Sequence, residues 1–357
     1  MLTVVDNNNK SFTLSDKYYM EFMMKLSSIT KGTMLAAAIT LTSTQAWAQC
    51  GTVTIAEMNW ASAEFAANLD KIILAEGYGC SVELVPGATN TTFASMEAKG
   101  QPDIAPELWT NAVSVRIKAA EAKGDLTVGV QLVSDASEGW FISDAIAKAH
   151  PELKTVDDVL AHPEFFPSKE DSSKGAFMNC PSGWGCETVN TNLVKASAFN
   201  LAKAGFAVID PGSSSGLDGA IAKAAQRGEA WFGYYWQPTV NVSKYNLKKL
   251  DFATSFDKKH WDECLAVADC ESPQRSSWTA SKVNTVVVTK FAKANPEVME
   301  YLNKRTYSSA QVGPVLVYMD ENQANGEDAA YEFLKNNQSL WSSWLPADVA
   351  ERVKKAL

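Results

Sequence analysis

Strand-like and helix-like segments alternate along most of this chain, and that alternation restricts its fold more than any other feature. Short runs with β-type patterns are each followed by a stretch with helical periodicity. Alternating βα units form mainly parallel sheets with flanking helices. The expected strands are 52–58, 81–85, 104–108, 175–179, 206–210, 230–235 and 285–290, and the segments 126–133 and 139–144 lead out of the first unit. The expected helices are 62–76, 91–99, 111–123, 187–204, 216–227, 296–304, 327–336 and 347–356.

The expected elements fall into two groups, and the chain returns to the first group at its end. We therefore predict an α/β fold of two lobes joined by two crossovers. Lobe 1 is expected to comprise 49–140 plus 251–357, and lobe 2 to comprise 141–250. Two lobes connected in this way close on a ligand by hinge motion, and ligand pockets favour such interfaces.

Residues 1–48 have the features of an export signal and an upstream leader. Lys25 and Lys31 form a basic region, 34–41 is a short apolar core, and Ala46-Trp47-Ala48 is a small-x-small cleavage site. A membrane anchor is the alternative, but spanning takes about 20 apolar residues and this run is far shorter. We predict a periplasmic protein whose signal peptide is cleaved near Ala48.

Composition narrows the classes of partner. The 357 residues are 46% hydrophobic, which is ordinary for a globular chain and sufficient for two cored lobes. The formal net charge is −9. An acidic chain is a poor binder of nucleic acid but a tolerable host for a cation.

Six cysteines in an exported chain favour disulfides over a metal site. Neighbouring parallel strands start at the same sheet edge, so the cysteines that precede 52–58 and 81–85 should be adjacent. Two other pairs each bracket a short loop. A zinc site is the competing interpretation, but the spacing is too wide and the three histidines lie far from these pairs. The expected disulfides are Cys50–Cys80, Cys180–Cys186 and Cys264–Cys270.

Tryptophans occur where five of the expected strands meet loops. Loops at the carboxyl ends of parallel strands are where open α/β sheets bind ligands. Tryptophan offers the best aromatic face for a cation, and a cage of such faces is the usual way to bind a quaternary ammonium ion. The pattern indicates a receptor for a small methylated cation, with a cage formed by Trp60, Trp109, Trp140, Trp184 and Trp236.

Several stretches resemble the substrate-binding proteins of ABC importers for glycine betaine, choline and related osmolytes. They are Glu-Met-Asn-Trp at 57–60, Pro-Asp-Ile-Ala-Pro-Glu-Leu-Trp at 102–109, Glu-Gly-Trp at 138–140, Asn-Cys-Pro-Ser-Gly-Trp at 179–184, Asp-Pro-Gly-Ser at 210–213 and Trp-Phe-Gly-Tyr-Tyr-Trp-Gln-Pro at 231–238. The resemblance covers essentially the whole chain after the signal. It implies a two-lobed periplasmic binding protein of type II, a Venus-flytrap fold.

The resemblance also implies a function without chemistry. The protein would capture a small onium ligand, use no cofactor, act as a monomer and deliver its ligand to an inner-membrane ABC permease. Carried over from the family pattern, the aromatic positions are Trp60, Trp109, Trp140 and Trp236. Ser62 stands where choline-type members have an acidic residue, which favours trimethylamine N-oxide, dimethylsulfoniopropionate or glycine betaine over choline.

Alternative roles remain open for most of these residues. Trp60 has a possible core role, Trp140 a possible packing role at the hinge, and Trp184 lies in a loop whose amides are an alternative site for the ligand's anionic end. Asn59 is a ligand contact or a helix cap. The carboxylates Glu57, Glu107 and Glu138 either approach the cation or are solvated loop charges. Trp261, Trp278, Trp341 and Trp344 do not follow the strand-end pattern, and Trp341 and Trp344, spaced i,i+3 near a helix, are expected to pack.

An exported hydrolase acting on a small cationic substrate is the alternative function. A hydrolase requires a nucleophile beside a positioned base. The chain has no Gly-x-Ser-x-Gly elbow and only three histidines. The loop 212–216 resembles a nucleophile loop only loosely, and its position before a helix favours a capping role for its serines.

Overall fold

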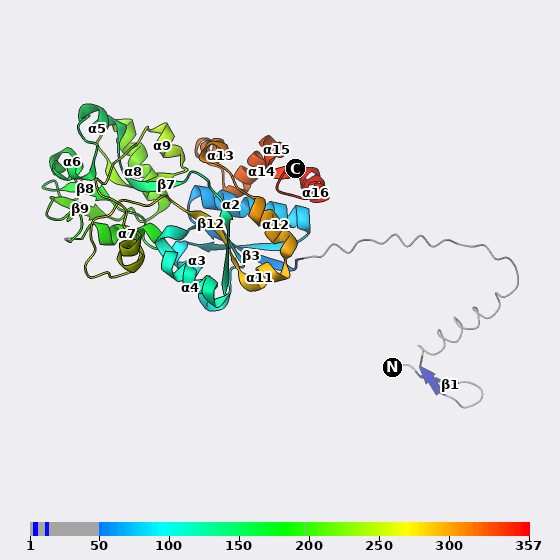
Figure 1. Cartoon of the computed structure of the whole chain (residues 1–357). Helices are drawn as coiled ribbons and strands as arrows, with labels where there is room; N and C mark the ends of the chain where they lie inside the picture. Colours follow the sequence, from blue (N-terminus) through cyan, green and yellow to red (C-terminus); the bar gives the residue numbers. More distant parts are fainter. Residues whose placement is uncertain (1–2, 6–10, 14–49, 196) are drawn as a thin grey trace. The chain divides into compact units, whose positions relative to one another are not determined.

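The computed structural model describes residues 3–5, 11–13, 50–195 and 197–357. Near the start of the chain, β1 (Thr3–Val5) and β2 (Ser11–Thr13) pair in antiparallel fashion. The part from residue 50 onward contains two five-stranded sheets with flanking helices (Figure 1). The predicted export signal and its cleavage site lie outside the described residues.

The first sheet has parallel strands at one side and antiparallel strands at the other. The central strand β3 (Thr52–Met58) pairs in parallel with β4 and β5, and β12 pairs antiparallel with β5 and β6. The strand order is β4 (Ser81–Gly87), β3, β5 (Ile104–Trp109), β12 (Val283–Val288) and β6 (Leu126–Gln131).

The second sheet repeats this design with other strands. β8 pairs in parallel with both β9 and β10, whereas β7 runs antiparallel to β10 and β11. The strand order is β11 (Lys248–Lys249), β7 (Ser137–Ile142), β10 (Phe232–Gln237), β8 (Gly175–Met178) and β9 (Phe206–Ile209).

The two-lobed α/β fold is confirmed, but the sheets are mixed and not mainly parallel. Each sheet contains two parallel and two antiparallel pairs. The strands that reverse direction, β7 and β12, are those that the chain enters directly after passing from one sheet to the other. A strand entered from the facing lobe starts at the edge where the parallel strands end, so it runs opposite to them.

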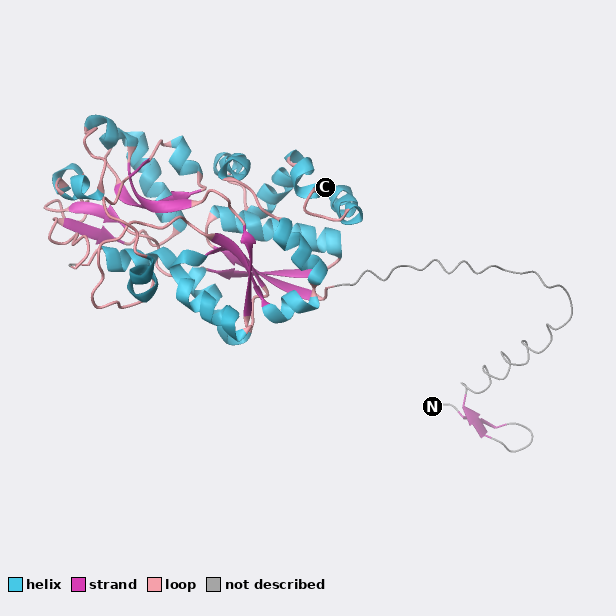
Figure 2. Cartoon of the chain, viewed as in Figure 1, coloured by secondary structure: helices cyan, strands magenta, loops and turns pink. Residues whose placement is uncertain are grey.

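Helices cover both faces of the first sheet (Figure 2). Helix α2 is buried over most of its circumference because it lies between β3 and β5 on one side and α14 on the other. The helices of this half are α2 (Ala61–Ile72), α3 (Thr89–Lys99), α4 (Ser114–Lys123), α11 (Thr289–Ala294), α12 (Pro296–Lys304), α13 (Ser309–Asn322), α14 (Gly326–Asn336), α15 (Gln338–Ser342) and α16 (Ala347–Ala356).

The helices of the second half are mostly short. The helix expected at 187–204 is shorter in the structure, where α7 ends at Leu193. At this point the side chains of Asn192 and Lys195 donate hydrogen bonds to backbone carbonyls of the 264–270 loop, and the chain then turns. The helices are α5 (Asp144–Ala149), α6 (Val156–Leu160), α7 (Gly185–Leu193), α8 (Ser214–Arg227), α9 (Val240–Lys244) and α10 (Lys258–His260).

Helix α13 was not expected from the sequence, because Pro314 lies inside it. Ser308 caps its start by accepting a bond from the Gln311 amide, so the helix has a defined first turn. Val312, Val315, Leu316 and Met319 are buried at helical spacing. The burial of this apolar face outweighs the backbone hydrogen bond that proline removes.

Two segments connect the sheets, at 132–136 and at 250–282. The segment 132–136 is fixed to lobe 1 by a parallel bridge between Val133 and Tyr307. The backbone amide of Ser134 donates to the Tyr307 carbonyl, and the Tyr307 amide donates to the carbonyl of Leu132. By strand membership, 137–142 belongs to the second sheet and 283–288 to the first. The lobe boundaries expected near 140 and 250 remain a prediction.

Candidate functional site

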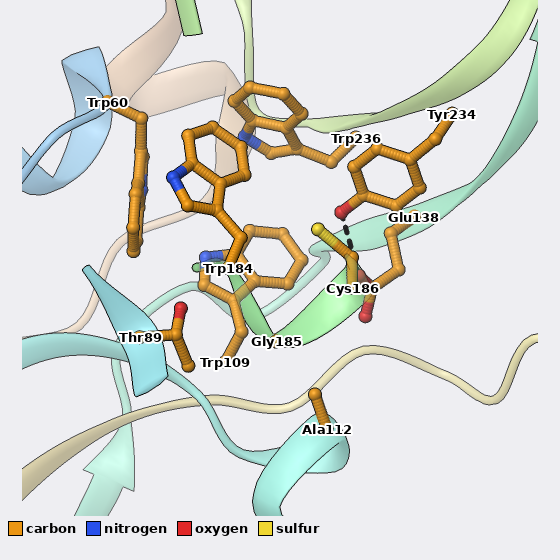
Figure 3. A pocket seen from close by; sticks show the side chains of 10 residues that line it. All are labelled: Trp60, Thr89, Trp109, Ala112, Glu138, Trp184, Gly185, Cys186, Tyr234 and Trp236. Carbon is orange, nitrogen blue, oxygen red and sulfur yellow. Dashed lines mark hydrogen bonds between the residues drawn. The ribbon is translucent and has the colours of Figure 1, made fainter. Parts of the chain in front are cut away.

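A small pocket lies between the two halves, at the ends of the parallel strands. Trp60 follows β3, Trp109 ends β5, Trp236 is near the end of β10, and Trp184 precedes α7. All four rings are at most 8% exposed. Figure 3 shows the lining residues, which are Trp60, Thr89, Trp109, Ala112, Glu138, Trp184, Gly185, Cys186, Tyr234 and Trp236.

Three of the four tryptophan rings meet edge to face. Trp184 lies between two other tryptophans, with ring centroids 5.0 Å from Trp60 and 5.1 Å from Trp236 and interplanar angles of 62° and 79°. Tyr234 is stacked against Trp236 with centroids 6.2 Å apart. Four of the five tryptophans predicted from the sequence line this pocket, and their contact with a ligand remains a prediction.

Glu107 lies behind the pocket, where it anchors two of the tryptophans. One carboxylate oxygen, Oε1, accepts bonds from the indole Nε1 of Trp60 at 2.7 Å, the Ser62 hydroxyl at 2.9 Å and the Trp109 Nε1 at 3.1 Å. The side chain is fully buried. Burial raises the pKa of Glu107, while these three bonds and the charge of Arg305 oppose the rise. The residue is thus neither a solvated charge nor part of the pocket lining.

Glu138 is the one carboxylate that lines the pocket. Its Oε2 accepts a bond from the Tyr234 hydroxyl at 2.9 Å, and its Oε1 accepts one from Ser281 at 3.3 Å. Burial raises the pKa of Glu138 to about 7, against the effect of these two bonds and of the Lys249 charge. A carboxyl group with that pKa has access to both protonation states near neutral pH.

Trp184 is positioned by a stapled loop and by a residue of the other half. The disulfide Cys180–Cys186 closes the loop, and the Gly183 amide donates to Glu187 at 2.8 Å. The Trp184 Nε1 donates to the side-chain oxygen of Asn59 at 2.9 Å. Asn59 neither lines the pocket nor caps α2, so its contact with Trp184 is a third role beside the two considered from sequence.

The two halves approach closely beside Trp184. A side chain added at Gly185 would place its Cβ 2.6 Å from the Ala112 Cβ of the first half, so only glycine fits between them. Asn90 of α3 also reaches the loop. Its backbone amide donates to the Gly183 carbonyl, and its side-chain amide donates to the Trp184 carbonyl.

Trp140 is not part of the pocket, so this prediction was wrong. It is fully buried beside Phe177, Phe199, Phe232 and Phe252, and its Nε1 donates to Asn190 at 2.8 Å. The cause is the direction of β7. Because β7 runs antiparallel to β10, its start and not its end is level with Trp236, which pairs with Glu138. Trp140 lies two residues deeper in the sheet.

Glu57 is also outside the pocket. Its carboxylate accepts a bond at 2.8 Å from Asn68 on α2, and the side chain is half-buried. The predicted contact with a ligand is therefore wrong for this residue. The packing role expected for Trp341 and Trp344 is consistent with their burial. Trp261 and Trp278 are buried as well, and the Trp278 ring contacts Tyr234 with ring centroids 5.6 Å apart.

The cysteines form the three predicted disulfides, Cys50–Cys80, Cys180–Cys186 and Cys264–Cys270. Within the described residues, no group of three or more His, Cys, Asp and Glu side chains is placed to bind a metal ion. The Ser213 hydroxyl accepts a bond from the Gly216 amide at 3.0 Å, which is the capping role favoured for that loop.

Sequence reasoning missed Tyr234 and Thr89 as lining residues. Both had an available signal. Tyr234 is two residues before Trp236 and therefore shares its face of β10. Thr89 comes two residues after the end of β4 and thus obeys the same strand-end rule as the tryptophans. Ala112, Gly185 and Cys186 line the pocket through the close approach of the halves, which sequence spacing does not reveal.

Comparison with known proteins decides the family. The family described as the substrate binding domain of ABC-type glycine betaine transport system matches residues 51–336. The chain belongs to this family.

Individual relatives are distant in sequence but similar in fold. The trimethylamine N-oxide-binding protein of Pelagibacter ubique (strain HTCC1062) is 21% identical over 295 residues, covering 81% of this chain and 89% of that protein. An ABC-transporter choline binding protein in complex with choline has a TM-score of 0.67 at 20% identity, covering 86% and 98% of the two chains. Lactococcal OpuAC in its closed form with glycine betaine has a TM-score of 0.63 at 18% identity, covering 83% and 100%.

Membership assigns the protein to the substrate-binding components of ABC importers, which bind small ligands for a membrane permease and are not enzymes. The expected type II periplasmic binding protein fold is confirmed by the same structures. Among the described residues, the structure has no helix long and apolar enough to cross a membrane.

Proposed function

We propose that the protein captures a small methylated onium osmolyte in a cage of four tryptophans and delivers it to an inner-membrane ABC permease. Glycine betaine, trimethylamine N-oxide, dimethylsulfoniopropionate and choline are the candidate ligands. One observation carries the proposal: four indole rings, each at most 8% exposed, surround a single small pocket. A desolvated cation gains about 2 kcal/mol or more from such rings.

The charges near the pocket favour a cationic ligand. Glu138 lines it and Glu107 lies directly behind two of its rings, whereas no lysine or arginine is among the lining residues. The distant relative from Pelagibacter, whose name states that it binds trimethylamine N-oxide, supports the same class of ligand.

Two features offer contacts for the polar end of the ligand. The first residues of α7, Gly185 and Cys186, line the pocket, so the amide groups at this helix start are available to a carboxylate or sulfoxide-like oxygen. Glu138 also lines the pocket; in its protonated form it donates a hydrogen bond to such an oxygen, and in its ionised form it attracts the onium head.

The pocket draws walls from both halves, and this supports closure on the ligand. Trp60 and Trp109 belong to the first half, and Trp184 and Trp236 to the second. A ligand in contact with both halves binds the closed form better, and only that difference drives closure. We further propose that the mature protein is a periplasmic monomer released by cleavage near Ala48, with lobe boundaries near 140 and 250.

Calorimetric titration with the four candidate ligands tests the proposal. Two matched substitutions identify the site. Trp236→Phe replaces a cage ring with a weaker cation–π face and should reduce affinity about threefold to tenfold. Trp140→Phe changes the same residue type outside the pocket and should leave affinity unchanged. The absence of binding to every ligand, or equal losses in both variants, contradicts the proposal.

Small-angle scattering with and without saturating ligand tests the closure. A decrease in the radius of gyration is expected on binding. An unchanged radius in a sample with confirmed binding would indicate a rigid pocket instead.

A further inference from the structure

Thr89 contributes a hydroxyl group to the pocket from the first turn of α3. The residue is only 2% exposed, yet no other described residue forms a hydrogen bond with this hydroxyl. The large majority of buried polar side chains have a hydrogen-bond partner, because an unpaired one has lost its water without compensation. A buried hydroxyl on a pocket wall therefore points to a bond with a molecule in the pocket.

A contact with the other half sets the orientation of Thr89. A side chain added at Gly185 would place its Cβ 3.3 Å from the Thr89 methyl group, so the methyl group faces the start of α7. Figure 3 shows the hydroxyl oxygen on the other side of the Thr89 side chain, turned toward the indole rings. The next residue, Asn90, fixes the start of α3 by donating to the carbonyls of Gly183 and Trp184.

Most other side-chain donors of the pocket wall already have an acceptor in the protein. These are the indole N–H groups of Trp60, Trp109 and Trp184 and the hydroxyl of Tyr234. No lysine or arginine lines the pocket, and the donors without an acceptor among the described residues are those of Thr89 and Trp236. An indole that presents its face to an onium head directs its N–H away from the ligand, because the N–H lies in the ring plane. Thr89 is thus the better-placed donor for an oxygen of the ligand.

We propose that Thr89 is a specificity-determining residue whose hydroxyl donates a hydrogen bond to the oxygen of the ligand, so that the pocket selects oxygen-bearing onium compounds over tetraalkylammonium ions. The inference rests on the proposed function and deepens it, because the cage rings attract an onium head whether or not the ligand has an oxygen. Gly185 at the start of α7 lies beside the Thr89 methyl group. A ligand oxygen bound by Thr89 is therefore near both halves, which favours the closed form.

The experiment compares each candidate ligand with an isostere in which methyl groups replace the oxygen atoms. Tetramethylammonium is the isostere of trimethylamine N-oxide, and isobutyltrimethylammonium is that of glycine betaine. Calorimetric titration of the wild type identifies the pair whose oxygen-bearing member binds most tightly. The ratio of the two dissociation constants then reports the preference for the oxygen. The charges of the two ligands are the same in every titration, so a change of this ratio in a variant isolates the contact with the oxygen.

Two substitutions of Thr89 give opposite results for a hydrogen-bonding role and a packing role. Thr89→Val keeps the methyl group that faces Gly185 but removes the hydroxyl, so it should lower the preference for the oxygen-bearing ligand about tenfold. Thr89→Ser keeps the hydroxyl and removes that methyl group, so the preference should stay within about threefold of the wild type. If Thr89 only packs, Thr89→Val changes neither affinity and Thr89→Ser weakens both ligands together.

Thr92→Val is the matched control, because Thr92 is a buried threonine on the same helix that does not line the pocket. It should leave the ratio unchanged. Trp236→Phe removes the other donor that has no acceptor, and it should weaken both ligands while keeping their ratio within about threefold. Thermal unfolding of each variant verifies the fold. Should Thr89→Val not fold, Thr89→Ala takes its place, since it differs from Thr89→Ser by the hydroxyl alone.

The outcomes separate this inference from the proposed function. If the wild type binds neither the candidate ligands nor their isosteres, the proposed function fails. If it binds them and Thr89→Val leaves the ratio unchanged, the function stands and the inference is overturned. An equal loss of preference in Thr92→Val, or a loss in Trp236→Phe without one in Thr89→Val, also overturns it. A loss of preference in Thr89→Val that Thr89→Ser does not share supports it.

Discussion

The two pairs of cage tryptophans are anchored in different ways. Trp60 and Trp109 of the first half share one acceptor, the Glu107 carboxylate, which belongs to the same half. Trp184 of the second half donates instead to Asn59, which belongs to the first. The first pair is therefore oriented by its own half, whereas the hydrogen bond that orients Trp184 requires both halves to be together.

This difference suggests an order of events. Under the proposed function, a ligand would meet a wall of preformed rings in the first half, and the second wall would take its final orientation as the cleft closes. The disulfide Cys180–Cys186 limits how far the second wall departs from that orientation, because it closes the loop that carries Trp184. Preorganisation of one wall reduces the entropy that the ligand must offset on binding.

The largest expected effect comes from removing the anchor of the first pair. Glu107→Ala leaves two buried indole N–H groups without an acceptor, at a cost of about 1–3 kcal/mol each. We expect affinity to fall by about 3 kcal/mol in calorimetric titration. Glu57→Ala is the matched control, because this carboxylate lies on β3, the strand paired with β5 in the same half, but outside the pocket. Equal affinity in the two variants would show that the first wall does not depend on Glu107.

The second prediction concerns pH and the carboxyl group that lines the pocket. The pKa of Glu138 is about 7 in the folded protein, against an ordinary value of 4.5. Its contribution to stability is thus fully present below pH 4.5 and is lost as pH rises through 7. Between these limits, the free energy of unfolding of the ligand-free wild type should fall by about 2 kcal/mol relative to Glu138→Gln.

Denaturant unfolding across the same pH range measures that difference. Affinity for a permanently charged ligand such as choline should change in the opposite sense, rising with pH in the wild type as Glu138 ionises, and should be less pH-dependent in Glu138→Gln. A constant difference in stability between the two proteins would contradict the prediction.

The third prediction tests the anchor that crosses the cleft. Asn59→Ala removes the acceptor of the Trp184 indole and should weaken ligand binding by about 1 kcal/mol. Because that bond requires both halves, the stability of the ligand-free open protein should not change. Asn246→Ala serves as control, since this amide bonds to Asp144 within the second half. A loss of ligand-free stability in Asn59→Ala alone would indicate that the second wall is also preformed.

The smallest effect is expected from an ion pair across the cleft. Lys244 on α9 contacts Asp320 on α13, and the two side chains are 43% and 35% exposed. Exposed pairs contribute about 0.2–1 kcal/mol and are screened by salt. Lys244→Ala should therefore reduce affinity by about 0.5 kcal/mol at low ionic strength and not at high ionic strength. Lys304→Ala, which breaks a pair within α12, should have no effect on affinity.

Much of the fold was accessible from sequence because it depends on local pattern. The strand 52–58 and the helices 296–304 and 347–356 have the expected bounds, since their periodicity is a local property of the sequence. The disulfides were predictable because strand starts and short loops place the cysteines together. Four cage tryptophans were predictable because the ends of parallel strands share one sheet edge.

The remaining features required the tertiary structure. The direction of β7, and hence the burial of Trp140, depends on where the chain enters the second sheet, which no residue near Trp140 encodes. The roles of Glu107 and Asn59 depend on which indole N–H groups reach them, over separations of 47 and 125 residues. Sequence by itself determined which side chains lie at the ends of strands. Only the packing of the halves decided which of them form the cage and which anchor it, because hydrogen bonds and close approach between distant segments leave no periodic trace in the sequence.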